Sequence, residues 1–407
     1  MRVQHKRRRD GGRGRAGIVS AVRRLLLLVS AITLADTMLY AALVPLLPHY
    51  AEEFGLGKAG SGLLVAAYAA GALVGALPAG LAAARFGPKR AVIAGLASMA
   101  VASVGFAVAG NAELLGLTRL FQGAGSALSW AGGLAWLVGG TPKHRRGEML
   151  GTAVGAAIFG ALLGPAVGAA AEHLGTRPVF LGVGAIAALL ALWALQTPGV
   201  EAEPQPLRTV VRGLRQPAIV GALWLMVMPA LLFGVVAVLV PLDLDRAGWG
   251  ATAIAAVFVA SAAIETVIAP LLGRFSDRRG RLLPLRLALV GAVVTTTAFA
   301  FADRPAAIVA LVVAAGIAFG ALWAPAMALL SEGAEGIGLA QGLAFGLMNL
   351  AWGAGNSLGP SIGGALADAA GDGLPFGLLA GLSAFTLAGL LRLPASGTRA
   401  LRVPEGT

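Results

Sequence analysis

Long apolar runs, separated by short polar or basic segments, recur from one end of the chain to the other. Each run matches the length of a helix that crosses the apolar core of a bilayer, which takes about 20 residues. The pattern therefore predicts an all-α membrane protein with twelve transmembrane helices. The predicted helices cover residues 24–48, 60–84, 90–109, 113–138, 148–171, 177–196, 217–241, 251–273, 283–302, 305–329, 341–367 and 375–392.

The composition agrees with a membrane protein and excludes several kinds of chemistry. Hydrophobic residues make up 57% of the chain and charged residues 12%, whereas soluble domains carry about 25% charged residues. The absence of cysteine excludes disulfides and thiolate chemistry. The sequence has no glycine-rich phosphate loop with lysine, no metal-ligand cluster and no nucleophile–base pair. We therefore expect a protein that is not an enzyme, that needs no cofactor or metal, and that is driven by an ion gradient.

Positive side chains are concentrated in alternate loops. With a cytoplasmic N-terminus, 26 of the 31 Lys and Arg residues lie on the cytoplasmic side and four on the other side. Cytoplasmic loops of membrane proteins carry such an excess, so we expect both termini in the cytoplasm, below an inner or plasma membrane. The same distribution accounts for the net charge of +12. The basic N-terminal segment is therefore expected to rest on anionic lipid and not to bind nucleic acid.

Sequence elements recur about half a chain apart. The stretches GLAAARFGPKR and GRFSDRRGRLL share a glycine, Gly87 in the first and Gly280 in the second, 193 residues apart. Glycine–proline pairs at 164–165 and 359–360 lie 195 residues apart. We therefore predict two six-helix bundles related by an internal repeat. The expected boundaries are a basic tail (1–23), an N-terminal bundle (24–196), a central cytoplasmic loop (197–216), a C-terminal bundle (217–392) and a cytoplasmic tail (393–407).

Three motifs occur in order along these halves. The first, glycine–x–Leu–x–Asp–Arg–x–Gly–Arg–basic, is met in the loop after span two and again after span eight, at Gly80, Arg85, Gly87, Lys89, Arg90, Gly273, Asp277, Arg278, Gly280 and Arg281. The second, Arg–x–x–Gln–Gly in span four, is met at Arg119, Gln122 and Gly123. The third is the glycine–proline pattern of spans five and eleven, at Gly160, Gly164, Pro165, Gly168, Gly355, Gly359, Pro360, Gly363 and Gly364.

Together the motifs resemble the major facilitator superfamily, in its twelve-span drug:proton antiporter branch. The first span, LADTMLYAALVPLLPHY, is also similar to vesicular monoamine transporters and their bacterial relatives. The resemblance implies two bundles that rock around a substrate site at mid-membrane. It also links the span-five motif to exchangers that export their substrate.

Three ionisable residues fall well inside predicted spans: Asp36, Arg119 and Glu265. A charge at the bilayer centre costs several kcal/mol, so such residues usually face a cavity or a partner and serve a function. Burial favours the neutral form of a carboxyl group, so Asp36 can bind and release a proton, or pair with a cationic substrate. Arg119 would be a fixed positive charge that tunes a neighbouring carboxylate. Glu265 is either a second proton site or a residue of the interface between the halves.

Polar and aromatic residues at helical spacing suggest a substrate cavity around these charges. In span one, Thr33, Asp36, Thr37 and Tyr40 are expected to form one polar stripe. In span four, Arg119, Gln122, Ser126 and Ser129 are expected to form a comparable stripe. The predicted cavity residues are Thr33, Thr37, Tyr40, Gln122, Ser126, Trp130, Trp323 and Asn349.

The repeated loop motif suggests a gate at the cytoplasmic side. In the resembling family the acid of this loop lies against the N-terminus of a helix in the other half, where Asp277 would meet the basic start of span five. The first copy has Ala84 at the matching position. The loop before span eleven is acidic instead, and its Glu332 and Glu335 are expected to meet the basic cluster of the first copy, Arg85, Lys89 and Arg90.

The sequence thus predicts a secondary transporter that exports a small organic, cationic or amphipathic compound in exchange for protons. Its expected partners are that substrate, protons and the lipid bilayer, and a monomer is expected to suffice. A proton-coupled uptake symporter for a metabolite is an alternative. A receptor or scaffold that transports nothing is a second alternative, against which the buried charges and the repeat both argue.

Overall fold

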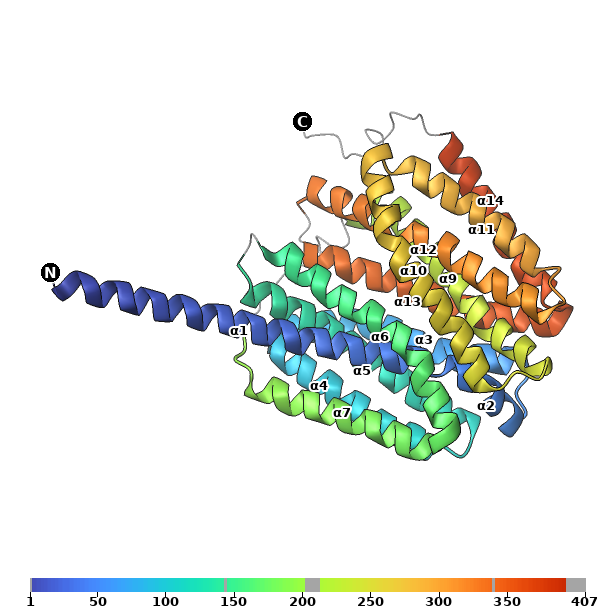
Figure 1. Ribbon diagram of the computed structural model, residues 1–407, viewed down its shortest axis with the longest axis horizontal. Coiled ribbons are helices and arrows are strands. Elements are labelled where there is room, and N and C mark those ends of the chain that lie inside the picture. Colours follow the sequence, from blue (N-terminus) through green and yellow to red (C-terminus); the bar gives the residue numbers. More distant parts are fainter. Residues whose placement is uncertain (1, 143–144, 202–212, 339–340, 393–407) are drawn as a thin grey trace.

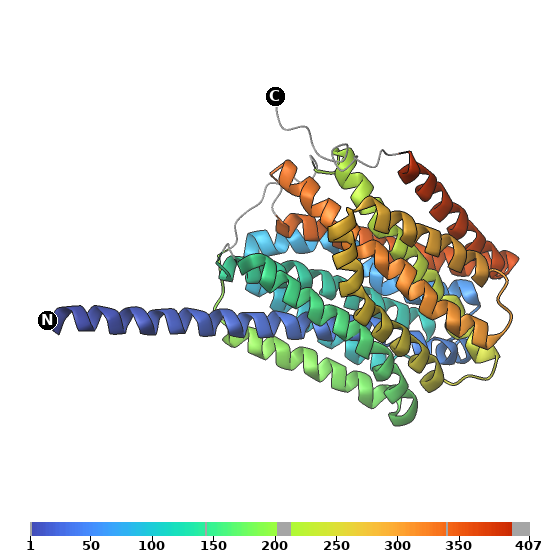
Figure 2. The ribbon, with the colours of Figure 1, turned by 45° about the horizontal axis from the view of Figure 1, so that its top comes forward.

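A computed structural model describes residues 2–142, 145–201, 213–338 and 341–392. In this part of the chain every regular element is a helix, and the helices form two bundles (Figure 1). Figure 2 shows the same division from another side, with the blue-to-green first half below the yellow-to-red second half. The predicted all-α class with two six-helix bundles is therefore confirmed.

In its described residues the N-terminal bundle contains six long helices, one short α-helix and one short 3-10 helix. The first predicted span is interrupted near its end, where two short helices follow α1, each with a proline, Pro45 or Pro48, at its second position. The elements are α1 (Arg2–Ala41), η1 (Val44–Leu46), α2 (Leu47–Glu53), α3 (Lys58–Phe86), α4 (Pro88–Ala107), α5 (Ala112–Gly140), α6 (Arg146–Leu174) and α7 (Thr176–Gln196).

The C-terminal bundle repeats the arrangement of six long helices. Pro217 begins its first helix, at the position where proline is best tolerated because the missing N–H would have no partner there. The helices are α9 (Pro217–Arg246), α10 (Ala251–Arg279), α11 (Leu282–Phe299), α12 (Pro305–Gly336), α13 (Gln341–Ala370) and α14 (Gly373–Leu391).

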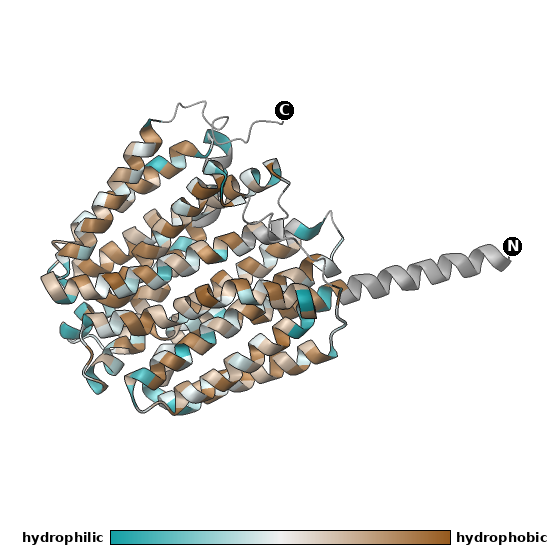
Figure 3. Ribbon diagram, turned by 180° about the vertical axis from the view of Figure 1, so that it is seen from behind, coloured by the Kyte–Doolittle hydropathy of each residue, from teal (hydrophilic) through white to brown (hydrophobic). Residues whose placement is uncertain are grey.

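Ten described segments are long and apolar enough to cross a membrane. Hydrophobic residues cover the lengths of the helices and hydrophilic residues gather near their ends (Figure 3). The two long helices outside this set are α5 and α13, which carry several polar side chains within their apolar sequence. Of these two helices, α5 carries the buried Arg119, and α13 contacts the opposite bundle.

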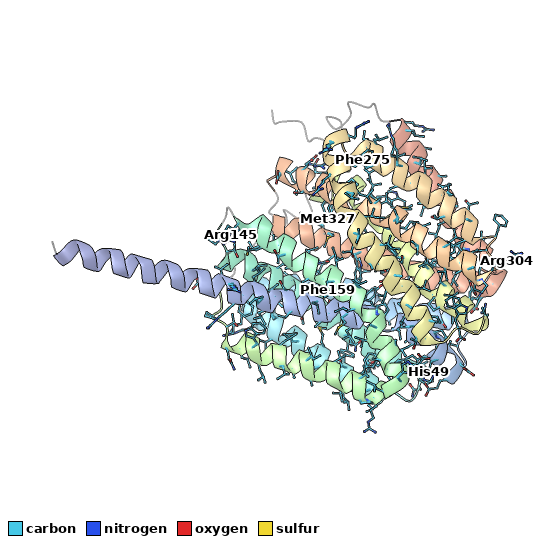
Figure 4. All side chains as sticks on the ribbon, in the orientation of Figure 1. His49, Arg145, Phe159, Phe275, Arg304 and Met327 are labelled. Carbon is cyan, nitrogen blue, oxygen red and sulfur yellow. The ribbon has the colours of Figure 1, made fainter. Side chains whose placement is uncertain are left out.

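The two bundles contact each other mainly through α3 against α13 and α6 against α10. We call the end with the repeated basic loops, which include Lys89 and Arg279, the basic end. The opposite end is called the far end. Figure 4 places Arg145 and Phe275 at the basic end, on different bundles, and His49 and Arg304 at the far end.

The contact between α3 and α13 closes at the far end and opens toward the basic end. Gly62, Leu73 and Gly80 share one face of α3 by helical periodicity. A Cβ at Gly62 would overlap the backbone of α13, and Leu73 packs on Gly353, but Gly80 and Gly346 both face open space. The bundles are therefore joined at the far end and separated along these helices at the basic end.

Candidate functional site

Asp36 is buried in the middle of the N-terminal bundle, where it is 2% exposed. Its carboxylate accepts three hydrogen bonds from two neighbouring helices. Oδ1 accepts from the Tyr68 hydroxyl of α3 at 2.7 Å. Oδ2 accepts from Ser126 Oγ at 2.8 Å and Trp130 Nε1 at 2.7 Å, both on α5. Three donors around one carboxylate stabilise its charge in a region that water does not solvate.

Arg119 is 1% exposed and contacts Tyr68, the same residue that bonds the Asp36 carboxylate. Its Nη1 donates to the carbonyl oxygen of Leu39 at 3.2 Å and its Nη2 to that of Tyr40 at 3.0 Å, so the guanidinium joins α5 to the end of α1. The guanidinium carbon is 4.8 Å from the centroid of the Tyr68 ring, a cation–π contact. Nη1 also donates to Gln122 Oε1 at 3.3 Å. The structure thus brings Asp36 and Tyr40 of span one together with the predicted polar residues of span four.

Tyr40 connects this cluster to the C-terminal bundle. Its hydroxyl donates to Asn356 Oδ1 of α13 at 2.9 Å. Its ring lies 5.1 Å from the ring of Tyr68 and 5.0 Å from that of Trp352, between centroids. The aromatic rings therefore line the boundary between the two bundles next to Asp36.

The polar stripe expected on span one is divided between two neighbours. Thr33 and Thr37 donate their hydroxyl hydrogens to carbonyl oxygens of α6, at Ala153 (2.9 Å) and Ala157 (2.6 Å). Asp36 and Tyr40 instead face α3, α5 and α13. In this conformation the two threonines join helices, and their hydroxyl donors are already used.

Glu265 lies between α10 and α12, inside the C-terminal bundle. A Cβ at Gly320 would come within 2.7 Å of the carboxyl carbon of Glu265, and a Cβ at Gly316 within 2.6 Å of Ser261 Oγ. Two glycines one turn apart on α12 thus leave room for the Glu265 side chain. The structure places this acid against α12 of its own bundle, and its role as a proton site stays a prediction.

The two remaining predicted cavity residues lie on the C-terminal bundle. Trp323 of α12 packs against the apolar core formed by α9, α11, α12 and α13. Asn349 of α13 is half-buried. Neither belongs to the hydrogen-bonded group around Asp36, so their place in a substrate cavity stays a prediction.

The repeated loop motif forms the same turn twice. Gly87 between α3 and α4 has φ +93°, and Gly280 between α10 and α11 has φ +79°, a conformation that side chains other than glycine rarely adopt. Among the acids of this gate, Glu332 accepts from Arg281 Nη2 at 3.2 Å within the C-terminal bundle. Lys89 Nζ donates to the Leu195 carbonyl oxygen at 2.8 Å. The Asp277 side chain lies outside the described residues.

The glycine–proline motifs pack one helix directly on another within each bundle. On α6, a Cβ at Gly160, Gly164 or Gly168 would overlap backbone or side-chain atoms of the first span. On α13, Gly355, Gly359 and Gly363 take the same role against α9. The helices continue through Pro165 and Pro360. The repeat therefore preserves a close helix contact in both halves.

Comparison with sequence models of protein families identifies the family of the chain. The model of the Major Facilitator Superfamily matches residues 26–344 and 248–406. The chain belongs to the Major Facilitator Superfamily. It is accordingly a multi-pass membrane transporter and not an enzyme.

Individual relatives are distant and only partly aligned. The MFS-type transporter ppzB of Metarhizium rileyi is 30% identical over 162 residues, which cover 39% of this chain and 33% of that protein. YhhS of Escherichia coli, an uncharacterized MFS-type transporter, is 27% identical over 54% of this chain and 56% of its own length. The quinolone resistance protein NorA of Staphylococcus aureus is 26% identical over 37% of this chain and 39% of its own length.

Two solved structures share the fold over nearly the whole chain. A D-xylose–proton symporter superimposes with a TM-score of 0.72 at 17% identity, covering 93% of this chain and 99% of the other. The xylose transporter XylE of Escherichia coli, in a partially occluded inward-open conformation, gives 0.75 at 16% identity, with 92% and 98% covered. At these identities the likeness concerns the fold alone.

Sequence reasoning missed Tyr68 and Asn356, the two residues that extend the Asp36 cluster. A signal for Tyr68 was present, since the chain has three tyrosines and all of them fall in predicted spans or at their ends. Asn356 had a weaker signal, as one amide within a glycine-rich helix. Their partners could not be inferred, because spacing along a helix does not identify the neighbouring helix.

Proposed function

We propose that this transporter exports a small organic, cationic or amphipathic compound in exchange for protons, by alternating access. The basic end would face the cytoplasm, together with both termini, and the membrane would be the inner or plasma membrane. The observation that carries the proposal is the buried Asp36 carboxylate with its three donors. An acid inside a membrane span marks a proton or substrate path more often than a structural contact.

The geometry offers a way for protonation to change the site. An ionised carboxylate only accepts hydrogen bonds, whereas a protonated one must also donate. Protonation of Asp36 would therefore either reverse its bond with the Tyr68 or Ser126 hydroxyl, which can turn to accept, or release one of the three donors from its present bond. A donor released in this way would then bind substrate. Arg119, which keeps its charge, would favour return of Asp36 to the ionised form.

Export is favoured over uptake by the glycine–proline motif of α6 and by the partial likeness to a quinolone resistance protein. The fold is also shared with a D-xylose–proton symporter, so an uptake symporter is the alternative. All the proposed parts occur in one chain, so we propose that a monomer is sufficient.

Everted membrane vesicles with an acidic interior separate the two directions of transport. With antiport, the outward proton gradient drives substrate into the vesicle lumen, and the lumen becomes less acidic as substrate is added. With symport, substrate leaves the lumen together with protons. A panel of drug-like cations and sugars, scored by substrate-dependent loss of the gradient, would test direction and substrate class together. If no compound in the panel changed the gradient, the proposal of proton coupling would be rejected.

We further propose that Glu332 and Glu335 meet the basic cluster Arg85, Lys89 and Arg90 when the basic end closes. Exposed ion pairs are worth about 0–1 kcal/mol each, and about 1 kcal/mol changes a two-state ratio about fivefold. Changing both acids to lysine is therefore expected to raise labelling of a cysteine placed at Gly346 by up to about fivefold.

Two further variants make this gate prediction specific. Arg281→Ala removes the partner that Glu332 has in the present conformation, and labelling in this variant should stay near wild type. Ala84→Asp in the double-lysine background should lower labelling again. Unchanged labelling in the double-lysine protein would show that the acidic loop has no part in the gate.

A further inference from the structure

The end of α6 is bonded to the start of α10 across the contact between the bundles. Glu172 Oε1 accepts from the Ala251 N–H at 3.2 Å, and Oε2 accepts from the Thr252 N–H at 2.9 Å and hydroxyl at 2.7 Å. The residue before this helix is Gly250, which has no side chain to bond these N–H groups itself. A carboxylate of the N-terminal bundle therefore takes the place of a local helix cap.

The end of α13 makes the matching contact in the other direction. Asp368 Oδ1 accepts from the Lys58 N–H at 2.9 Å, and Oδ2 from the Ala59 N–H at 2.8 Å, at the start of α3. The residue before α3 is again a glycine, Gly57. The Lys58 side chain adds an ion pair with Asp372, which belongs to the same end of the C-terminal bundle.

The two contacts are related by the internal repeat. Gly57 and Gly250 are 193 residues apart, and the acids Glu172 and Asp368 are 196 apart. One acid comes from the N-terminal bundle and the other from the C-terminal bundle, so each bundle caps a helix of the other. A shared ancestry of the halves accounts for the pairing, and neither contact is produced by packing within a bundle.

Both contacts lie at the far end, where the bundles meet. The first N–H groups of a helix have no partner within the helix, and a carboxylate placed there gains charge-assisted hydrogen bonds and a favourable interaction with the helix dipole. Rocking that separates the far ends must break both sets of bonds. Next to the Asp368 contact, Gly62 and Gly364 also let α3 and α13 approach backbone to backbone.

We propose that Glu172 and Asp368 are paired latches that hold the far end closed and so set the balance between the two orientations of the transporter. Each acid does this by capping a helix that has only glycine at its own cap position. The latches act only on the contact between the bundles, so they do not depend on substrate, transport direction or proton coupling.

Cysteine labelling at two positions tests the latches. The chain contains no cysteine, so Ser357→Cys reports on the far half of the contact and Gly346→Cys on the open basic end. Ser357 is buried on the face of α13 that also carries Gly353 and Gly364. Labelling is done in detergent, where the reagent reaches both ends.

Removal of the latches should shift labelling in opposite directions at the two ends. Glu172→Ala and Asp368→Ala are each expected to raise far-end labelling about threefold, and together about tenfold, while labelling at Gly346→Cys falls. Asp303→Ala, which removes an exposed acid at the same end, is the matched control and should change neither rate. A rise at both positions would indicate loss of structure and would overturn the proposal, as would unchanged far-end labelling in the double variant.

A second kind of variant removes one latch without removing the acid. Gly57→Ser provides a local cap for α3, and the backbone at this position already has the extended conformation that a serine cap adopts. Its Cβ would come within 2.7 Å of Asp368 Oδ2, which must then move away. Far-end labelling is expected to rise as in Asp368→Ala, with helix α3 still capped. The latch would be rejected if labelling rose in Asp368→Ala but stayed at the wild-type level in Gly57→Ser. The rise in Asp368→Ala would then come from the loss of the α3 cap alone.

Discussion

Asp36→Asn is expected to lower proton-driven transport by about 100-fold or more, the range in which loss of a positioned proton-transfer group commonly falls. Asparagine has nearly the shape of aspartate but does not ionise, so it carries no proton across. Its amide nitrogen is also a donor, and would face at least one of the three donors that now bond the carboxylate. The measurement is pH-driven substrate flux in vesicles.

Substrate exchange without a gradient provides the internal control for this variant. An asparagine variant that still exchanges labelled for unlabelled substrate, but no longer accumulates it against a gradient, has lost proton coupling alone. Asp303→Asn, at an exposed site of the far end, should behave as wild type in both assays. Wild-type pH-driven flux in Asp36→Asn would place the coupling proton elsewhere, with Glu265 as the next residue to examine.

The second large effect is expected from Gly164→Leu combined with Pro165→Ala. A Cβ at Gly164 would come within 2.7 Å of the Met38 carbonyl oxygen and closer still to Ala41. Extra side-chain volume in such a contact costs about 1–3 kcal/mol or more. Helix α6 would have to move away from α1, and Thr37 would then lose its bond to Ala157. We expect the protein to reach the membrane but to transport at less than about a tenth of the wild-type rate.

The same helix offers a matched control for this prediction. Gly155 of α6 faces open space, so Gly155→Leu adds the same volume without an overlap and should retain transport. Pro165→Ala alone creates no overlap and should have a smaller effect than the double change. Equal transport by Gly164→Leu/Pro165→Ala and Gly155→Leu, at matched amounts in the membrane, would mean that the close contact of α6 with α1 is not needed for turnover.

The sequence alone determined the number and place of the membrane helices, because spanning a bilayer depends on the length and composition of a single segment. It also located the repeat, and with it the paired turns at Gly87 and Gly280, since a positive φ is a local demand that glycine meets. The burial of Asp36 and Arg119 followed from their positions within spans. Each of these features is set by residues close together in the chain.

Only the tertiary structure decided which helix each polar face meets. Helical spacing placed Thr33, Asp36, Thr37 and Tyr40 near one another, yet the threonines bond to α6 while Asp36 bonds to α3 and α5. A helix about 10 Å wide contacts several neighbours, so residues one position apart can face different helices. The caps from Glu172 and Asp368 could not be predicted from the sequence for the same reason. Each joins residues of opposite bundles, and the packing of the bundles decides which residues so far apart in sequence come together.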